Sequence, residues 1–281
     1  MRIHAIQTGT VAVKERQVQG KGRGGIAVLN TLLDRHWTQS LPIYAWVIEH
    51  PEGIIVVDTG ETAQASTPGY FPRWHPYYRL GVKAWVTPDQ EIGPRMQALG
   101  IPANEVRWVV MTHLHTDHAG GLHHFPQAEI LVSRKEYEAA CGFMGKLRGY
   151  LPHRWPAWFA PRLIDFADGP VGPFPTSDSL TQAGDVHLVP TPGHSAGHLS
   201  VIVEDGGLSF FLAGDTSYTQ ELMRHQVIDG VTRDWRAARS TLARTLQYVK
   251  DVPTVYLPSH DPESARRLLQ RQVAASVGTP S

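Results

Sequence analysis

The segment from Thr112 to Gly121 concentrates side chains that bind metal ions. It reads THLHTDHAGG and follows an apolar run directly. In extended backbone, side chains two residues apart point the same way, so His113, His115 and Asp117 can converge while His118 begins the following turn. Imidazoles suit zinc or iron, and a carboxylate supplies the negative charge that two adjacent divalent ions require. This loop can therefore serve two ions, and a His-rich surface loop is the less favoured interpretation.

Three further motifs offer metal ligands where apolar runs end. His194 lies in the tight turn TPGHSAGH, Asp215 lies in LAGDTSYT, and His260 lies in LPSHD. Each motif alone is weak, because a single His or Asp at a strand end is commonly a turn or capping residue. Together with the first motif they make a candidate shell of five imidazoles and two carboxylates.

The elements that must position these side chains are strands interrupted by helices. Apolar runs and turn residues predict strands over 2–8, 43–49, 54–57, 106–111, 186–189, 199–203, 208–212 and 255–257. Helices are expected over 88–99, after Ser133 as far as Ala140, over 232–249 and over 261–270. Ser133 with Glu136 has the pattern of a capping box. This order favours an α+β fold, in which two mixed sheets carry outer helices, over a strictly alternating parallel barrel.

The stretch 143–176 is rich in proline and aromatic residues. It is predicted to be neither regular helix nor central strand, and irregular segments of this kind commonly line pockets. We expect it to form an insertion on the substrate side of a single domain, 1–281. The further aromatic residues expected in an apolar pocket wall are Tyr70, Phe71, Trp74, Tyr77 and Tyr78. A contact between two copies of the chain, in a homodimer, and packing of this loop on the core are the alternative uses of these side chains.

Composition excludes several classes of protein. The longest apolar run, Ile43 to Ile48, is far shorter than the about 20 residues that a membrane-spanning helix needs. The start MRIHAIQTG has no apolar core of a secretory signal, so a cytoplasmic location is expected. Lys and Arg number 26 and balance 26 Asp and Glu, which removes the basic footprint of proteins that bind nucleic acid or anionic membranes. Cys141 is the one cysteine and is expected to be a small buried side chain.

Several conspicuous residues are predicted to lie outside the chemistry. His123 and His124 follow the first motif and are expected to be helix-end or surface residues. His198 is expected to hydrogen-bond near the turn that carries His194. The glycine-rich segment 19–25, QGKGRGG, lacks the GK[ST] ending of a phosphate-binding loop and is expected to be a mobile surface loop.

The four motifs, in this order along the chain, resemble those of the metallo-β-lactamase superfamily. That fold is an αββα sandwich with its metals at the edge between two sheets, and the resemblance spans residues 41–261. It implies one ion held by His113, His115 and His194, a second held by Asp117, His118 and His260, and Asp215 bridging both. The strand ending VVDTG contains Asp58, which matches a further landmark of the family and implies support of the ligands from behind.

Within the superfamily, the chain is most similar to N-acyl-homoserine lactone lactonases. The similarity lies in HLHTDHAGG, in RKEYEAA at 134–140, in TPGHSAGHLS and in DTSYT at 215–219. It implies that Tyr218 hydrogen-bonds the substrate carbonyl and that Asp117 passes a proton to the departing alkoxide. Two divalent ions, zinc first and iron, cobalt or manganese as alternatives, lower the pKa of a shared water toward about 7, so no protein nucleophile is required.

The leading hypothesis is therefore a dinuclear metal-dependent hydrolase that opens a small lactone with an apolar acyl chain. A glyoxalase-II-like thioesterase and an organophosphate or aryl-ester hydrolase remain alternatives, because one fold hosts many substrates. The neutral net charge opposes a nuclease of the same superfamily. A zinc-stabilised binding module is less favoured, since structural zinc sites are closed four-ligand sites.

Overall fold

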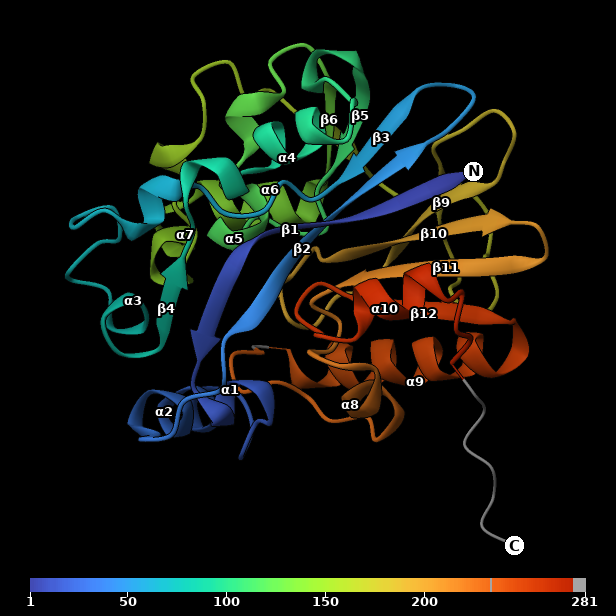
Figure 1. The fold of residues 1–281 in the computed structure, drawn as a ribbon. Helices are drawn as coiled ribbons and strands as arrows, with labels where there is room; N and C mark the ends of the chain where they lie inside the picture. The colour runs from blue at the N-terminus through green and yellow to red at the C-terminus, as the bar shows by residue number, and fades with distance from the viewer. Residues whose placement is uncertain (233, 275–281) are drawn as a thin grey trace, which may run out of the picture.

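Two β-sheets lie face to face in the computed structural model, and helices cover the outer side of each sheet (Figure 1). The structure describes residues 1–232 and 234–274. The strands of the first sheet are β1 (Arg2–Val13), β2 (Leu41–Glu49), β3 (Ile54–Val57), β4 (Val82–Trp85), β5 (Val106–Val110), β6 (Glu129–Ser133) and β7 (Arg162–Ile164). The strands of the second sheet are β8 (Asp178–Ser179), β9 (Val186–Pro190), β10 (Leu199–Asp205), β11 (Leu208–Gly214) and β12 (Thr254–Pro258).

Both sheets are mixed, as the sequence predicts. Within the described residues the strand orders are β4-β1-β2-β3-β5-β6-β7 and β12-β11-β10-β9-β8. In the first sheet, β4, β1, β2 and β3 pair antiparallel, whereas β3, β5, β6 and β7 pair parallel. In the second sheet, β12 is parallel to β11 and the remaining pairs are antiparallel.

The helices complete the outer layers and one end of the molecule. They are α1 (Glu15–Val18), α2 (Gly25–Leu33), α3 (Pro76–Leu80), α4 (Ile92–Ala98), α5 (Thr116–Ala119), α6 (Arg134–Cys141), α7 (Phe143–Leu147), α8 (Gln220–Arg224), α9 (Trp235–Asp251) and α10 (Ser264–Leu269). Short 3-10 turns are η1 (Ala63–Ser66), η2 (Pro88–Gln90), η3 (Ala103–Glu105), η4 (Leu122–His124) and η5 (Pro152–Arg154). None of the described helices is long and apolar enough to cross a membrane.

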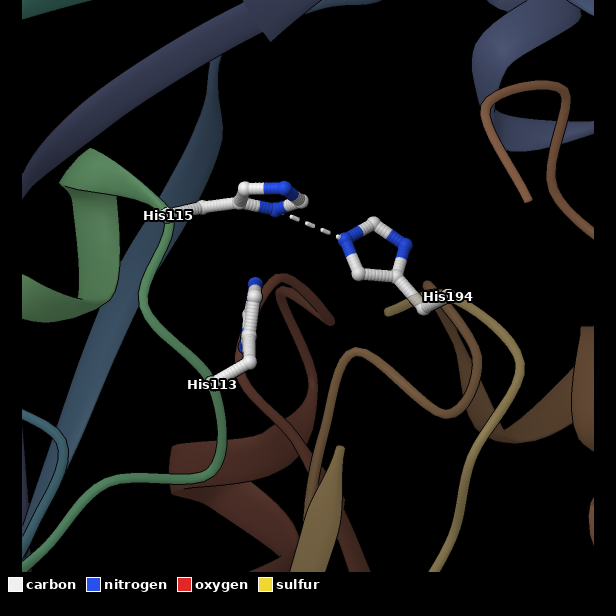
Figure 2. Close-up of side chains that lie close together, drawn as sticks. All are labelled: His113, His115 and His194. Carbon is white, nitrogen blue, oxygen red and sulfur yellow. Dashed lines mark hydrogen bonds between the residues drawn. The ribbon is translucent and has the colours of Figure 1, made fainter. Parts of the chain in front are cut away.

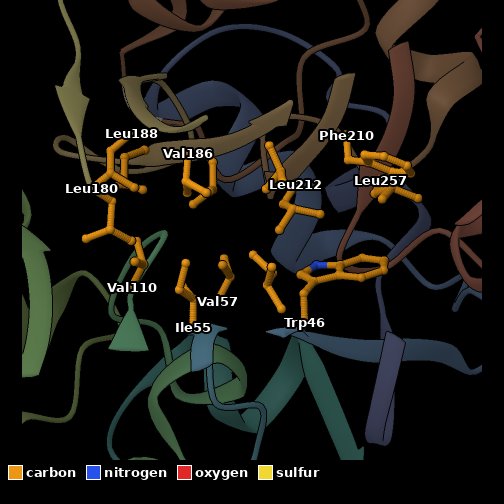
Figure 3. Close-up of a cluster of buried hydrophobic side chains, with 14 of the residues drawn as sticks. Trp46, Ile55, Val57, Val110, Leu180, Val186, Leu188, Phe210, Leu212 and Leu257 are labelled. Atoms are coloured by element: carbon orange, nitrogen blue, oxygen red, sulfur yellow. The ribbon is translucent and has the colours of Figure 1, made fainter. Parts of the chain in front are cut away.

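The core between the sheets follows from alternation along the strands. In β2, Trp46 and Ile48 face the second sheet, whereas Ala45 and Val47 belong to the core under the outer helices. Figure 3 shows Trp46 opposite Leu212 and its neighbours from the second sheet. Because both faces of β2 are covered, its sequence is an unbroken apolar run rather than a polar and apolar alternation.

The outer helices bury apolar faces against the sheets. Ile92 and Met96 of α4 pack on the first sheet, and Leu242 of α9 packs on Phe211 and other side chains of the second sheet. The αββα sandwich that the motifs predict is confirmed. Each strand end that carries a candidate ligand is held by a buried core on at least one face.

Several boundaries differ from the sequence prediction for local reasons. The helix expected over 88–99 splits into η2, where Thr87 and Gln90 form a capping box, and α4. The helix expected from residue 232 starts at Trp235, because the Asp234 carboxylate accepts the free backbone N–H groups of the first turn. The sequence patterns do not predict strands β4, β6, β7 and β8 or helices α1, α2, α3, α7 and α8.

The stretch 143–176 is less irregular than expected. It contains α7, η5 and β7, and β7 lies at the edge of the first sheet, as its proline-rich flanks require. The expectation for Cys141 was wrong: its side chain is exposed at the end of α6, because the buried face of that helix is formed by Glu136 and Ala140.

Candidate metal centre

The seven candidate ligands meet at one edge of the sandwich, where strands of both sheets end. His113 and His115 lie in the loop after β5, and Asp117 and His118 lie in α5. The other three come from the second sheet: His194 from the loop between β9 and β10, Asp215 from the end of β11, and His260 from the end of β12. Side chains up to 147 positions apart in the sequence are therefore neighbours, as the strand-end motifs predict.

One group of ligand atoms comprises three imidazoles. Nδ1 of His115 lies 3.1 Å from Nε2 of His194, and Figure 2 shows the ring of His113 pointing toward the gap between them. The ligand atoms of all three lie within 4.8 Å of one another. Two ligands of a tetrahedral zinc ion with bonds of about 2.0–2.1 Å stand about 3.3–3.4 Å apart, so this trio has the size of a metal site.

A second group contains Asp117, His118 and His260 and shares Asp215 with the first. Nε2 of His260 lies 3.4 Å from Oδ2 of Asp117 and 3.4 Å from Oδ1 of Asp215. Nε2 of His118 lies 3.3 Å from the same Oδ1. The other oxygen, Oδ2 of Asp215, lies 3.6 Å from Nε2 of His194 in the first group. Asp215 thus turns one oxygen toward each group.

Buried atoms without partners test whether cations fit here. Nε2 of His113, Nε2 of His118 and Oδ1 of Asp215 are buried and make no hydrogen bond within the described residues. Buried polar atoms are almost always paired in folded proteins, because leaving one unpaired costs about 1–3 kcal/mol. A donor set of imidazoles and carboxylates whose free lone pairs converge suits divalent transition metals.

Burial and neighbouring charge set the protonation of the ligands. Burial, then the charges of neighbouring imidazoles, holds the pKa of His113 and His115 well below its usual range. Burial alone would raise the pKa of Asp215, but the imidazoles of His260 and His118 hold it well below its usual value. The neutral rings and the ionised carboxylate are the forms that bind metal.

Asp58 supports this arrangement from beneath the loop after β5. Its carboxylate accepts the backbone N–H and the hydroxyl of Thr112, both at 2.8 Å, and Nδ1 of His118 at 2.7 Å. The residue has φ of 59°, a conformation that is sparse for non-glycine residues and that aspartate tolerates better than most. Asp58 therefore fixes the ring of His118 with Nε2 facing the centre.

The imidazoles of His194 and His260 are also oriented by a partner at Nδ1. Nδ1 of His194 lies 3.2 Å from Oδ2 of Asp229, and Nδ1 of His260 donates to the carbonyl of Pro42 at 2.9 Å. Asp229 was missed by the sequence analysis, although the turn sequence DGVT, in which it also accepts the N–H groups of Val231 and Thr232, is a recognisable signal.

His198 lies where the sequence analysis expected it. Its Nδ1 lies 2.9 Å from the hydroxyl of Thr191, and its Nε2 accepts the backbone N–H of Asp215 at 3.0 Å. Burial lowers the pKa of this imidazole to about 3, so the ring is neutral. Gly214 has φ of 54°, and a Cβ there would lie 2.7 Å from Nε2 of His198. Only glycine at this position therefore allows the backbone N–H of Asp215 to reach that nitrogen.

Glu136 does not form the capping box that its spacing from Ser133 predicts. Its buried carboxylate instead accepts the N–H of Leu114 at 3.1 Å, the hydroxyl of Ser195 at 2.6 Å and the N–H of Gly197 at 3.1 Å. Within the described chain, Ser133 makes no side-chain cap to α6. One carboxylate thus ties the loop that bears His113 and His115 to the loop that bears His194.

A cavity of about 480 Å³ opens onto these ligands. Of the predicted aromatic wall, Phe71, Trp74, Tyr77 and Tyr78 line it. The rest of the prediction was wrong within the described lining: Tyr70 is not part of it, and residues 147–150 are the part of 143–176 that is. Trp155 and Phe159 pack beside the core under the outer helices, and Phe174 is buried under α9.

A further part of the wall comes from α2, which begins where the predicted surface loop 19–25 ends and for which the sequence gives no prediction. Val28 and Leu32 of α2 line the cavity with Val11, Val13 and Val82 of the neighbouring strands. Figure 1 shows α1, α2, α3 and β4 gathered at the same end of the molecule. The cavity therefore combines an apolar wall with a floor of candidate metal ligands.

Tyr218 lines the same cavity and is held by a residue from α1. The side-chain amide of Gln17 donates to the phenol oxygen of Tyr218 at 2.8 Å and to that of Tyr77 at 3.0 Å. The ring of Tyr218 also lies against His260, with centroids 5.6 Å apart. Burial raises the pKa of both phenols well above 10, so each keeps its proton, and Gln17 leaves that proton free to be donated elsewhere.

Comparison with known proteins agrees with this geometry. Residues 39–260 match the sequence profile of the metallo-beta-lactamase superfamily. The chain therefore belongs to the metallo-beta-lactamase superfamily.

Its relatives include N-acyl homoserine lactonases. The chain is 30% identical over 230 residues to N-acyl homoserine lactonase AiiA of Bacillus thuringiensis subsp. kurstaki, covering 81% of this chain and 84% of AiiA. It is 25% identical over 283 residues to N-acyl homoserine lactonase AttM of Rhizobium radiobacter, covering 94% of each chain. A crystal structure of an AiiA variant with N-decanoyl-L-homoserine bound superposes with a TM-score of 0.72, at 24% identity, over 99% of this chain and 97% of that one.

Proposed function

We propose that this protein is a dinuclear metal-dependent hydrolase that opens the ring of N-acyl homoserine lactones. The observation that carries the proposal is Asp215, whose two oxygens face two separate groups of imidazoles at the floor of a cavity. The similarity to AiiA and AttM, both N-acyl homoserine lactonases, selects the substrate class. In this proposal His113, His115 and His194 would hold one ion, Asp117, His118 and His260 would hold the other, and Asp215 would offer one oxygen to each.

The ions, when bound, would supply an activated water and a Lewis acid for the lactone carbonyl. Zinc is the proposed metal, because imidazole-rich sites with carboxylates suit it, and a solved structure with a TM-score of 0.63 is described as a dizinc lactonase, AidC. The protein contributes the rigid placement of the ligands through Asp58, Asp229 and Glu136.

Tyr218 is the proposed donor to the substrate carbonyl oxygen. Its phenol is protonated, lines the cavity and accepts from Gln17, so its own O–H is free to point at a substrate. A donor that is already oriented stabilises negative charge that develops on that oxygen without reorganisation in the transition state. Tyr77 has the same free O–H on the other side of Gln17.

Asp117 is the proposed proton shuttle. Its side chain is 23% exposed, lines the cavity and holds Oδ2 3.4 Å from Nε2 of His260. A carboxylate at the border between ligands and solvent can take a proton from water and deliver it to the alkoxide that leaves when the ring opens. The apolar wall formed by Val28, Leu32 and Phe71 is the proposed binding surface for the acyl chain.

The experiment that tests this function is a side-by-side assay of zinc-loaded protein. The panel contains an N-acyl homoserine lactone, an S-acyl glutathione thioester and an aryl phosphotriester. We expect kcat/KM for the lactone to exceed the other two by at least about tenfold, which corresponds to about 1.4 kcal/mol of additional transition-state stabilisation. A thioester or phosphotriester that is hydrolysed as fast as the lactone would contradict the proposal.

A further inference from the structure

A second cluster of metal-ligating side chains lies outside the candidate metal centre. Glu91 stands at the start of α4, and His123 and His124 form the end of η4, which follows the THLHTDHAGG motif. Nε2 of His124 lies 2.7 Å from Oε2 of Glu91, and Nε2 of His123 lies 3.0 Å from the same oxygen. From the sequence, both histidines are expected to be helix-end or surface residues.

We propose that Glu91, His123 and His124 bind a third divalent transition-metal ion, separate from the two at the candidate metal centre. The ligand atoms of the three side chains lie within 4.8 Å of one another. Two imidazoles and one carboxylate are a common ligand set for zinc, and a fourth position stays open to water. Hard ions such as magnesium and calcium prefer oxygen ligands and fit this set poorly.

Hydrogen bonds hold the carboxylate of Glu91 in the orientation that a metal ligand needs. Its Oε1 accepts the backbone N–H of Ala63 at 2.7 Å and the hydroxyl of Thr62 at 3.1 Å, which leaves Oε2 to face the two imidazoles. Glu91 is therefore a ligand whose orientation is already fixed.

The hydrogen bonds of His123 leave one position that a cation would satisfy. Its Nδ1 lies 3.2 Å from the carbonyl oxygen of Gly120, and its Nε2 faces Oε2 of Glu91. Both neighbours are acceptors, whereas a neutral imidazole has a single N–H. If Nδ1 donates to Gly120, the lone pair of Nε2 faces a carboxylate lone pair, and a cation between them turns that repulsion into two bonds.

The rings of His123 and His124 lie side by side, with centroids 4.1 Å apart. Nε2 of each ring faces the same oxygen of Glu91, so the two imidazoles and the carboxylate converge on one point. A metal ion with His123 donating from Nδ1 to a backbone carbonyl is the arrangement that metal-bound histidines commonly adopt.

Binding of a zinc ion requires the ligand atoms of Glu91, His123 and His124 to move slightly apart. The N–O distances of 2.7 and 3.0 Å are shorter than the about 3.3–3.4 Å expected between ligands of a tetrahedral zinc ion. The side chain of His123 is 45% exposed and can turn outward by a few tenths of an ångström. A bound ion would fasten the turn after the THLHTDHAGG motif to α4 and to the backbone at Ala63.

The test is a calorimetric titration of protein whose candidate metal centre is already loaded with zinc. Zinc ions alone are the titrant. We expect one further equivalent per chain to bind to the wild type, and His123→Ala and His124→Ala each to weaken that binding by at least about tenfold. His225→Ala is the matched control, because His225 is an exposed histidine paired with Glu221 at 2.7 Å and has no second imidazole in that pair. It should leave the third equivalent intact.

Lactone hydrolysis by the same proteins separates this site from the candidate metal centre. His123→Ala changes an exposed side chain, so it should fold, keep two zinc ions and retain the wild-type rate. Absence of a third equivalent in the wild type would overturn the proposal, and so would its retention in both His123→Ala and His124→Ala. Its loss in His225→Ala would place the extra ion elsewhere and overturn the proposal equally.

Discussion

The hydroxyl of Ser195 donates to Oε2 of Glu136 at 2.6 Å, which joins the loop bearing His194 to helix α6. The other oxygen of Glu136 accepts the N–H of Leu114, between His113 and His115, and the hydroxyl of Tyr150 at 2.9 Å. The carboxylate is fully buried, so these donors take the place of water as its hydrogen-bond partners. Two loops that carry ligands of one candidate ion are thus held at a fixed separation.

Replacement of Glu136 should therefore weaken metal binding. Glu136→Gln presents an amide N–H₂ to donors that need an acceptor, which costs about 1–3 kcal/mol of folding stability for the unpaired groups. We expect zinc affinity to fall about 10- to 100-fold, in line with other residues that orient metal ligands. Zinc retained during competition with a chelator measures the affinity, and thermal unfolding measures the stability.

Glu138→Gln is the matched control for Glu136→Gln, since Glu138 is exposed on the same helix. It should leave both quantities unchanged. Equal zinc retention in the two variants would show that Glu136 does not hold the loops in the way described.

Gln17 should act on the reaction through Tyr218. Gln17→Leu removes the amide that fixes the phenol oxygen of Tyr218, and we expect kcat to fall with little change in bound zinc. Tyr218→Phe removes the donor itself and should lower kcat about 100-fold, the usual effect of losing one donor to a developing oxyanion. The double variant should be no slower than Tyr218→Phe, because residues in direct contact are not additive.

Gln19→Leu serves as the control for Gln17→Leu, because Gln19 is exposed just beyond α1. Its kcat should match the wild type. If Gln17→Leu slows the enzyme further when Tyr218 is already phenylalanine, Gln17 acts on the substrate by another route.

The ligands could be predicted from the sequence because they stand in short motifs at strand ends. THLHTDHAGG places four of them in one loop, and core strands bring the others to the same edge. Residues that act through tertiary contact left no such signal. Gln17 reaches Tyr218 across 201 residues, and Asp229 reaches His194 across 35.

Local sequence patterns gave wrong predictions where tertiary contacts determine the structure. Ser133 and Glu136 have capping-box spacing, but Glu136 is recruited by the two ligand loops. Glycines at 20, 22, 24 and 25 concealed α2, because glycine has a poor helix propensity. One wall of the cavity was therefore missed, and the aromatic stretch 143–176 was given too large a share of it.

Asp229 provides a further test of the candidate metal centre. Burial alone would lower the pKa of His194, but Asp229, and after it Asp215, raise it to about 9. Asp229→Asn removes that charge, and we expect zinc affinity to drop about 10- to 100-fold. Asp251→Asn, at the exposed end of α9, is the control and should bind zinc as the wild type does. Unchanged zinc affinity in Asp229→Asn would exclude a role for this carboxylate in holding His194.

Chain-length preference should respond to the wall formed by α2. Leu32 lines the cavity, whereas its neighbour Leu33 is 67% exposed and is not part of the lining. Leu32→Trp fills space that an acyl chain would occupy, and each methylene kept out of the cavity forfeits roughly 0.8 kcal/mol. Exclusion of two methylenes should lower kcat/KM for a decanoyl substrate about tenfold, while a butanoyl substrate is hydrolysed at the wild-type rate. Leu33→Trp adds the same bulk outside the cavity and should change neither value. A uniform loss across all chain lengths in Leu32→Trp would indicate damage to the metal centre, and no loss for any chain would show that the acyl group binds elsewhere.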